Sequence, residues 1–207
     1  MRGVTASSWV LAAVAIVGAS ACIGGRASPT TRHYVLTPVI GTPSIGDPGT
    51  AASFVLGVGP VQLPAYLDRP QMVVRQAAGS IEISEFDQWG ESLRDGTTRV
   101  VAINLARLLP ECRVVAFPWR SGEQIRYQVV LDIEQMDGSA GGSVALDVRW
   151  RVLDRSGKEV AARVSRVSQP ASNGTAADAI SRALAALTQD IARDLRATAM
   201  AVAVTGE

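Results

Sequence analysis

Histidine and cysteine are scarce in this chain of 207 residues, which has one histidine, His33, and two cysteines, Cys22 and Cys112. A zinc site or a Ser-His-Asp triad needs a histidine held among structured partners, whereas His33 lies beside a flexible segment. A Cys-His nucleophile fails for the same reason, because Cys112 follows the Pro110-Glu111 turn and no second histidine exists. The composition therefore predicts a protein that is not an enzyme and needs no metal or cofactor.

An excess of either charge is also absent. The chain has 20 basic and 19 acidic residues, and the basic residues are dispersed along it. Proteins that bind nucleic acids concentrate Lys and Arg in one patch, so we exclude that class. The glycines of Gly57-Val58-Gly59 do not form a dinucleotide-binding loop, because Pro60 stands where a helix should begin and Gln62 occupies the third glycine position. We interpret this segment as a strand that contains glycines.

Two further groups of side chains are candidate sites. A cluster of carboxylates is compatible by spacing with a general acid/base pair, but such a cluster at a strand end is typical of a solvated edge, which we favour. Three tryptophans in or beside predicted strands could line a ligand cleft, and core packing is the favoured interpretation. The carboxylates are Glu82, Glu85, Asp87 and Glu91, and the tryptophans are Trp89, Trp119 and Trp150.

The first 22 residues have the pattern of a bacterial secretory signal. Arg2 provides the basic start, Val10 to Val17 form an apolar run, and Ala19-Ser20-Ala21 are small residues in front of Cys22. The run is shorter than the roughly 20 residues that cross a bilayer as a helix, so a permanent transmembrane anchor is the weaker interpretation. A cysteine directly after the small residues is where bacterial lipoproteins are acylated. We predict that residues 1–21 are removed and that Cys22 carries the lipid.

The signal departs from the usual lipoprotein pattern at Ala19, where Leu is favoured. An ordinary signal peptide cleaved near Ala21 is therefore the alternative. With two or three acyl chains on Cys22 the attachment would be stable. Ile23 replaces the Asp that commonly retains such proteins at the inner membrane, so we predict attachment to the periplasmic face of the outer membrane. After acylation only Cys112 remains, and one thiol cannot form an internal disulfide.

The rest of the chain divides into three parts. Residues 22–33 comprise the lipidated cysteine and a Gly/Ser/Thr/Pro-rich tether, and the eleven residues after Cys22 span at most about 40 Å. Residues 34–200 form one domain, and residues 201–207 form a C-terminal tail. The Ala/Val-rich stretch from Ala197 to Val204 is either a frayed helix end or an apolar segment that needs a partner.

Period-two alternation indicates strands in the domain. Apolar residues occupy every second position from Ile125 to Ile133 and again from Val144 to Val152, with polar residues between them, which is typical of antiparallel strands with one wet face. Asp137-Gly138, Gly141-Gly142 and Ser156-Gly157 are interpreted as turns. The predicted strands are Tyr34–Thr37, Phe54–Val61, Gln71–Gln76, Ser80–Phe86, Arg113–Trp119, the two runs above, and Glu159–Val167.

Two segments have helical spacing instead. The first lies between Leu93 and Leu109 and ends before Pro110. The second begins with Thr175 as N-cap and carries an apolar stripe from Ile180 through Leu187 to Leu195. Together the segments predict a single α+β domain with a mainly antiparallel sheet and two amphipathic helices packed on one face.

One connection between strands has a specific composition. Pro64 and Pro70 fix the backbone and bracket a rigid turn, in which Asp68 is expected to accept from local amides or pair with Arg69. The ring of Tyr66 is expected on the core with its hydroxyl facing outward. A purely structural role for this segment is the alternative to a role in binding.

The run from Tyr66 to Arg75, followed by a strand and then by Phe86-Asp87-Gln88-Trp89-Gly90-Glu91-Ser92-Leu93, resembles the ABC-type transport auxiliary lipoprotein family, which includes the paraquat-inducible protein C type. The resemblance extends over the lipidated start, the first strand at Tyr34-Val35-Leu36, the second strand and the closing helix. It implies a non-enzymatic accessory subunit of an intermembrane lipid-transport system, which docks a periplasm-spanning MCE-domain protein.

The same resemblance gives the candidate contact residues, which either form the contact or support it. They are Tyr66, Leu67, Asp68, Arg69, Pro70, Gln71, Arg75 and Trp89. An assembly of several copies is compatible with this role. Two other functions remain open, a lipid-binding carrier with an apolar cavity of several hundred cubic ångströms and a lipoprotein activator of a cell-wall synthase.

Overall fold

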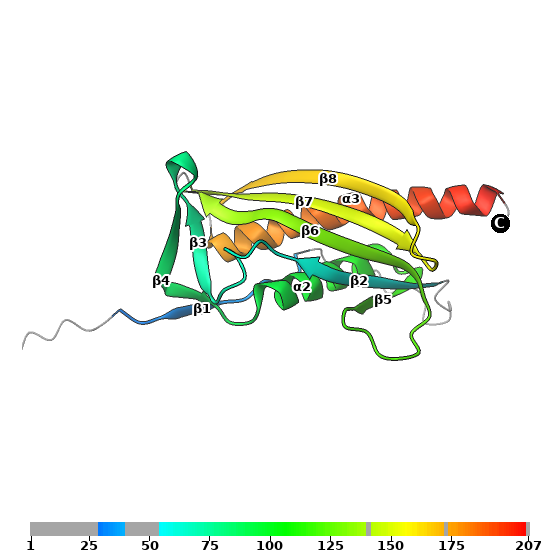
Figure 1. Cartoon of the computed structure of the whole chain (residues 1–207), viewed down its shortest axis with the longest axis horizontal. Coiled ribbons are helices and arrows are strands. Elements are labelled where there is room, and N and C mark those ends of the chain that lie inside the picture. Colours follow the sequence, from blue (N-terminus) through cyan, green and yellow to red (C-terminus); the bar gives the residue numbers. More distant parts are fainter. Residues whose placement is uncertain (1–28, 40–53, 140–141, 172–173, 206–207) are drawn as a thin grey trace, which may run out of the picture. The chain divides into compact units, whose positions relative to one another are not determined.

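Figure 1 shows the computed structural model, which describes residues 29–39, 54–139, 142–171 and 174–205. The part from Thr31 onward forms one α+β unit, and only residues 29 and 30 are described in the unit that precedes it. The predicted signal peptide and Cys22 lie outside the described residues. In the described part, no helix is both long enough and apolar enough to cross a membrane.

Eight strands, one short 3-10 turn and two α-helices make up the described part of this unit. Seven of the eight predicted strands and both predicted helices are present, and the first strand is shifted from the predicted Tyr34–Thr37 to Arg32–Tyr34. In chain order the elements are β1 (Arg32–Tyr34), β2 (Phe54–Gln62), β3 (Gln71–Arg75), η2 (Ala77–Gly79), β4 (Ile81–Trp89), α2 (Leu93–Leu108), β5 (Cys112–Ala116), β6 (Ile125–Ser139), β7 (Ser143–Asp154), β8 (Glu159–Pro170) and α3 (Ala176–Thr205).

The long strand β6 connects the two parts of the sheet. One edge of β6 pairs antiparallel with β7, which in turn pairs antiparallel with β8. The other edge is shared, because β2 runs parallel to the first half of β6 and β3 pairs with its last two residues, Gly138 and Ser139. Beyond β2 lies β5, and beyond β3 lie β4 and β1.

The sheet is mixed, so the prediction of a mainly antiparallel sheet is wrong. Among the described strands, four of seven pairings are parallel, namely β1 with β4, β2 with β5, β2 with β6 and β3 with β6. The antiparallel meander of β6, β7 and β8 is confirmed. Alternation shows that one face of a strand is buried, but it does not give the direction of the neighbouring strand.

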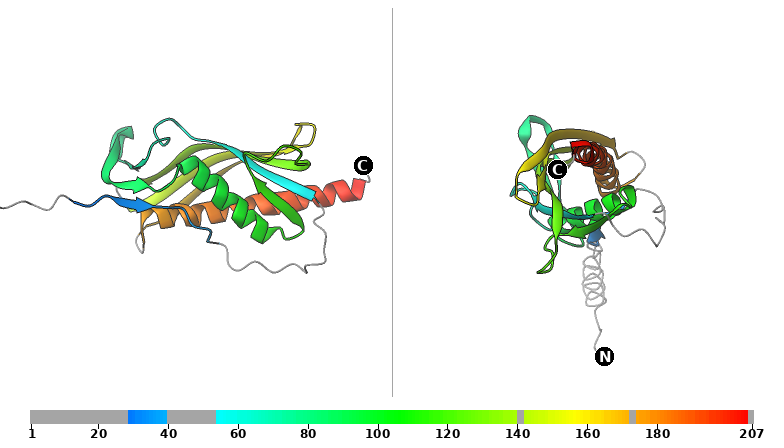
Figure 2. Two further views of the ribbon diagram at one scale, coloured as in Figure 1. Left: turned by 90° about the horizontal axis from the view of Figure 1, so that it is seen from below. Right: turned by 90° about the vertical axis from the view of Figure 1, so that its right-hand side faces the viewer.

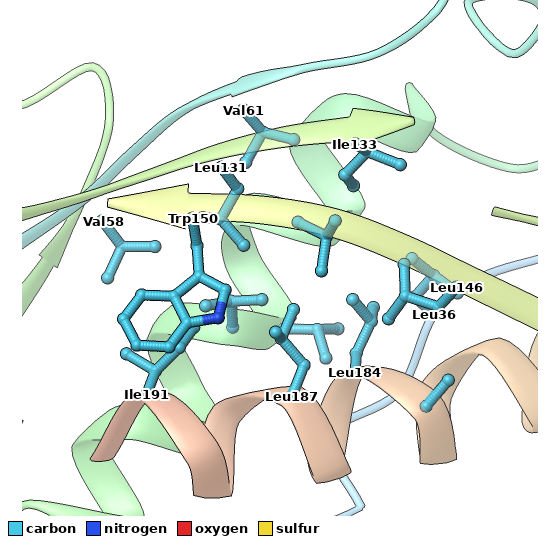
Figure 3. Close-up of a cluster of buried hydrophobic side chains, with 14 of the residues drawn as sticks. Leu36, Val58, Val61, Leu131, Ile133, Leu146, Trp150, Leu184, Leu187 and Ile191 are labelled. Atoms are coloured by element: carbon cyan, nitrogen blue, oxygen red, sulfur yellow. The ribbon is translucent and has the colours of Figure 1, made fainter. Parts of the chain in front are cut away.

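Both helices lie against the same concave face of the sheet, as the end-on view in Figure 2 shows, and they contact each other. The predicted stripe of α3 is confirmed, since Ile180, Leu184, Leu187, Ile191 and Leu195 are all buried. Figure 3 shows Leu184, Leu187 and Ile191 of this stripe on the side of α3 that faces Trp150 of β7. The apolar area removed from water here contributes most of the stability of the fold.

The start of α3 has the predicted cap. The backbone N–H of Asp178 donates to the Thr175 hydroxyl over 3.2 Å, and the Asp178 carboxylate accepts from the Thr175 N–H over 2.9 Å. This reciprocal arrangement satisfies backbone donors that the first turn of a helix leaves free. The hydrogen bonds from Thr175 lower the pKa of Asp178.

The glycine-containing segment is strand β2, as predicted. A Cβ on Gly57 would approach Cζ3 of Trp119 to 3.1 Å, so the strand passes close beneath this ring. Trp89 and Trp150 are buried in the core, in agreement with the core-packing interpretation, whereas Trp119 is half-buried outside the core and lies edge-on to Phe117.

Candidate interaction site

The connection between β2 and β3 is a compact turn between Pro64 and Pro70. The Leu67 N–H donates to the Pro64 carbonyl over 2.9 Å, and the Leu67 side chain enters the core. The Trp89 N–H donates to the Pro70 carbonyl over 2.7 Å, which ties the turn to the end of β4. The predicted rigid turn is therefore present.

Three side chains far apart in the sequence meet below this turn. The Tyr66 hydroxyl donates to Oδ2 of Asp137 over 2.8 Å. The Arg75 guanidinium donates to both carboxylate oxygens of Asp137, with Nη2 2.8 Å from Oδ2 and Nε 3.3 Å from Oδ1. It also donates to the Tyr66 oxygen over 2.9 Å and lies over the Tyr66 ring. The hydroxyl of Tyr66 thus faces inward, contrary to the prediction.

Asp137 is the buried centre of this network, with 1% of its side chain exposed. Gln135 donates a further hydrogen bond to its Oδ1 over 2.8 Å. Burial, followed by the bond to Asp137, raises the pKa of Tyr66 to about 12, so the phenol stays protonated and keeps donating. A buried carboxylate is tolerated only when paired and hydrogen-bonded, as here.

Sequence reasoning missed Asp137, because Asp137-Gly138 was interpreted as a turn. Both residues lie inside β6, opposite Ala145 and Val144 of β7. The feature of the sequence that could have identified Asp137 is its position. It follows Met136 directly and lies at the end of a run in which one strand face is mostly apolar. Only the fold brings it to Tyr66 and Arg75, which precede it by more than sixty residues.

The remaining motif residues have different surroundings. Asp68 is exposed and pairs with Arg94 of α2 at 2.8 Å, whereas local amides or Arg69 were the predicted partners. Arg69 is half-buried, and its Nε has no hydrogen-bond partner among the described residues. Pro70 is exposed, and Trp89 is in the core. The motif therefore has a buried side that holds the turn and an exposed side at Asp68 and Pro70.

A hollow of about 670 Å³ lies beside the motif, between the β3–β4 hairpin and the start of α3. Three motif residues, Leu67, Gln71 and Trp89, line it together with side chains of both hairpin strands. Such a volume lies within the range of sites for small molecules or for a partner's side chains.

The candidate catalytic side chains do not converge on one site. His33 is exposed in β1, and burial, with a smaller contribution from Glu111, raises the pKa of the Cys112 thiol to about 12. No group of three or more His, Cys, Asp or Glu side chains suited to a metal occurs among the described residues.

The carboxylate cluster is also dispersed. Glu91 pairs with Arg99, and Glu82 accepts from Gln76. Burial would raise the pKa of Asp87, but hydrogen bonds from Arg32, Ser84 and Tyr34 outweigh it and lower the pKa. A carboxylic acid held ionised in this way is unsuited to act as a general acid.

The fold has relatives among solved structures. An uncharacterized protein matches with a TM-score of 0.66 and 18% identity, over 81% of this chain and 99% of its own. A DUF330 protein from Xanthomonas campestris matches with a TM-score of 0.63 and 18% identity, over 83% of this chain and 99% of its own. PelC from Paraburkholderia phytofirmans, crystallised as a dodecamer, matches with a TM-score of 0.42 and 14% identity. This match covers 68% of this chain and 89% of the PelC chain.

The comparison with curated proteins gives no match. The comparison with family models gives one, the ABC-type transport auxiliary lipoprotein component, and it covers residues 34–192. This range begins in β1 and ends within α3, so it takes in the motif, the buried network and the sheet. The chain belongs to the ABC-type transport auxiliary lipoprotein family.

Proposed function

We propose that this protein is a non-enzymatic accessory subunit of an MCE/ABC-type intermembrane lipid-transport system, which docks the periplasm-spanning MCE-domain protein at the outer membrane. The observation that carries this proposal is the family match over residues 34–192. An auxiliary component of an ABC transporter acts by binding other subunits, and the scattered titratable groups described above suit binding better than catalysis.

Attachment to the membrane is the first part of this proposal. Acyl chains on Cys22 would anchor the chain, and the short tether would keep β1 and the turn between Pro64 and Pro70 near the periplasmic face of the outer membrane. The exposed side of the motif, with Asp68 and Pro70, is available there for a partner, while Tyr66 and Arg75 hold it in place. Several copies acting together would multiply such contacts.

The anchor is tested by replacing Cys22 with Ser and separating membranes from soluble periplasm. We expect the wild-type protein in the outer-membrane fraction and the Cys22→Ser variant in the soluble fraction. Globomycin, which blocks removal of lipoprotein signals, should make the uncleaved precursor accumulate. A wild-type protein found soluble in untreated cells would contradict the anchor.

The docking role is tested by capture. The full chain, purified from membranes in detergent, is mixed with envelope extract, and the retained proteins are identified. We expect an MCE-domain protein to be retained, and Asp68→Arg to reduce its recovery without loss of folding, because Asp68 is exposed. Retention of a cell-wall synthase instead would favour an activator of that enzyme and would overturn the proposal.

A lipid-binding carrier is the second candidate, favoured by the hollow of about 670 Å³. We rank it lower because Glu82 and Glu85 line the same hollow and would repel the phosphate of an anionic lipid. Mass spectrometry of lipid released from the purified Cys22→Ser chain tests it. One phospholipid per chain would move the carrier to first place.

A further inference from the structure

Strands β3 and β4 separate in the middle of their hairpin. Val73 pairs with Ile83, whereas Gln71 pairs with Gln88, so β4 has extra residues between these two pairs. The extra residues form a bulge in which the Ser84 hydroxyl accepts a backbone hydrogen bond over 3.0 Å. Bulges of this kind are frequent at sheet edges and next to functional sites.

The hollow of about 670 Å³ lies along this bulge and is called here the hairpin cleft. Every residue from Glu82 to Asp87 lines it. Because successive residues of a strand point to opposite faces, a hollow that touches a continuous run reaches the backbone of the strand. Its floor consists of buried apolar side chains, namely Leu67, Met72, Trp89, Met136 and Ile180. The two methionines are flexible and can adapt to the shape of a ligand.

The outer edge of β4 is open beside the hairpin cleft. In the described part of the chain, β1 is the strand that pairs with this edge, and it covers Asp87 to Trp89. No described strand pairs with the outer edge from Ile81 to Phe86, where Ile83 is 41% exposed and Phe86 is 37% exposed. Figure 1 shows the hairpin at one end of the sheet. An open edge offers unpaired backbone N–H and C=O groups to another chain.

The rim of the hairpin cleft is acidic. Glu82 accepts a hydrogen bond from Gln76, and neither Glu82 nor Glu85 has an ion-pair partner among the described residues. None of the described residues that line the cleft is Lys or Arg. Of the three carboxylates, Asp87 alone is neutralised, by Arg32 of β1. The cleft therefore carries negative charge that this part of the fold does not compensate.

The arginines of the surrounding elements are engaged in other contacts. Arg75 of β3 binds Asp137, and Arg182 of α3 donates to the Pro170 carbonyl. Across the described part of the chain, most arginines are in ion pairs with carboxylates. A second copy of this chain thus has few free cations for the cleft, which favours a different protein as the occupant.

We propose that the hairpin cleft binds an extended segment of the MCE-domain protein that carries both basic and apolar side chains, an inference that rests on the docking role proposed above. The segment adds a strand to the open edge of β4. Its apolar side chains enter the cleft, and its basic side chains pair with Glu82 and Glu85 at the rim. In this mode of recognition, backbone hydrogen bonds supply affinity and the pocket supplies specificity.

Hydrogen exchange tests the backbone contact. The full lipidated chain in detergent is compared with and without the purified MCE-domain protein. We expect backbone amides between Glu82 and Phe86 to exchange about tenfold more slowly in the complex, because an added strand provides them with hydrogen-bond partners. The amides of β8, at the other edge of the meander, should exchange at the same rate in both samples.

Substitutions test the cleft itself. The pair Glu82→Lys and Glu85→Lys should reduce capture of the MCE-domain protein about tenfold, because both rim charges are reversed. Gly138→Leu changes no charge but should have a similar effect by filling the cleft. Gly138 lines the cleft, and a Cβ built there has its nearest neighbouring heavy atom 4.0 Å away, so the larger side chain has room.

The control is the pair Glu159→Lys and Asp190→Lys, which makes the same change in net charge on exposed or partly exposed residues that do not line the cleft. It should leave capture unchanged, and thermal melting shows that each variant is folded. Unchanged exchange of β4 in a complex that forms would overturn the inference. So would full capture by the Glu82/Glu85 pair. In both cases the docking role would still stand.

A wild-type chain that captures no MCE-domain protein would contradict the docking role instead. A blocked octapeptide of alternating Lys and Val then tests the cleft by itself, with a Glu/Val peptide as its control. Slower exchange of β4 with the Lys/Val peptide alone would support a cleft for basic and apolar segments. Equal exchange with both peptides, or protection of β4 that depends only on the concentration of this chain, would overturn the inference.

Discussion

Strands β6 and β7 of the meander bury an apolar side chain at nearly every second position, whereas the connection between β2 and β3 depends on the buried carboxylate of Asp137. In the meander each residue needs only an apolar neighbour, and many side chains can supply one. In the connection, Tyr66 and Arg75 must meet one particular carboxylate. The comparison shows that the first region is specified by a pattern and the second by individual partners.

The largest expected effect comes from a charged substitution in the apolar core beneath the meander. In Leu187→Asp an unpaired carboxylate replaces a fully buried side chain of α3, at a cost of several kcal/mol against a total stability of about 5–15 kcal/mol. We expect an unfolded chain by circular dichroism. The matched variant Leu187→Met should lose less than about 1.5 kcal/mol. If Leu187→Asp melted at the wild-type temperature, the stripe of α3 could not face the core.

The next largest effect comes from removing the cation that pairs with Asp137 below the connection between β2 and β3. Arg75→Leu leaves the Asp137 carboxylate buried without its cation, which we expect to cost about 3 kcal/mol in urea unfolding. The double variant Arg75→Leu with Asp137→Leu removes both charges and should recover a large part of this loss. A double variant less stable than Arg75→Leu would show that the network contributes more than mutual neutralisation.

A smaller effect concerns the cap of α3, where Thr175 lines the hollow of about 670 Å³. Thr175→Ala should cost about 1 kcal/mol of stability. Because the folded state lowers the pKa of Asp178, the cap contributes fully above the ordinary Asp pKa of about 4 and is lost as the pH falls through the lower folded value. The stability difference between wild type and Asp178→Asn should therefore shrink in acid, and a difference that grew there would contradict this sign.

The smallest expected effect is the reactivity of the Cys112 thiol in the wild-type protein, which needs no substitution. Burial raises the pKa of Cys112 to about 12, so at pH 8 the thiol is protonated, and it is buried in β5, which packs against α2. We expect Ellman's reagent to react with it only after unfolding in urea. Rapid reaction in the folded chain would show that the apolar region opens locally far more often than its packing indicates.

The strands and helices were predictable because periodicity is local. The stripe of α3, the cap at Thr175 and the meander all follow from residues within a few positions of each other. The pairing of β1 was not predictable in this way. The sequence placed that strand at Tyr34–Thr37, but the structure has it at Arg32–Tyr34, where Arg32 and Tyr34 bind Asp87 of β4.

The candidate site was predictable in its position and not in its contacts. The prolines revealed the turn, but the partner of Asp68 is Arg94 and the partner of Tyr66 is Asp137, and both are distant in sequence. In α2, the fully buried Thr97 and Asn104 are polar residues that a pattern would place outside. Thr97 is accommodated because its hydroxyl donates to the Leu93 carbonyl, a bond that sequence alone does not reveal.

The short pairings of β1 with β4 and of β3 with β6 determine how the sheet transmits a pulling force. A pull on the chain before Arg32 reaches β4 through three ladder positions, and β3 passes the load into β6 through only two, at Gly138 and Ser139. The meander behind them is joined by far longer ladders. Tension applied through an anchored N-terminus would therefore separate β1 from β4 before it disturbed the helices. The short β1–β4 pairing would open first, and the core would stay folded.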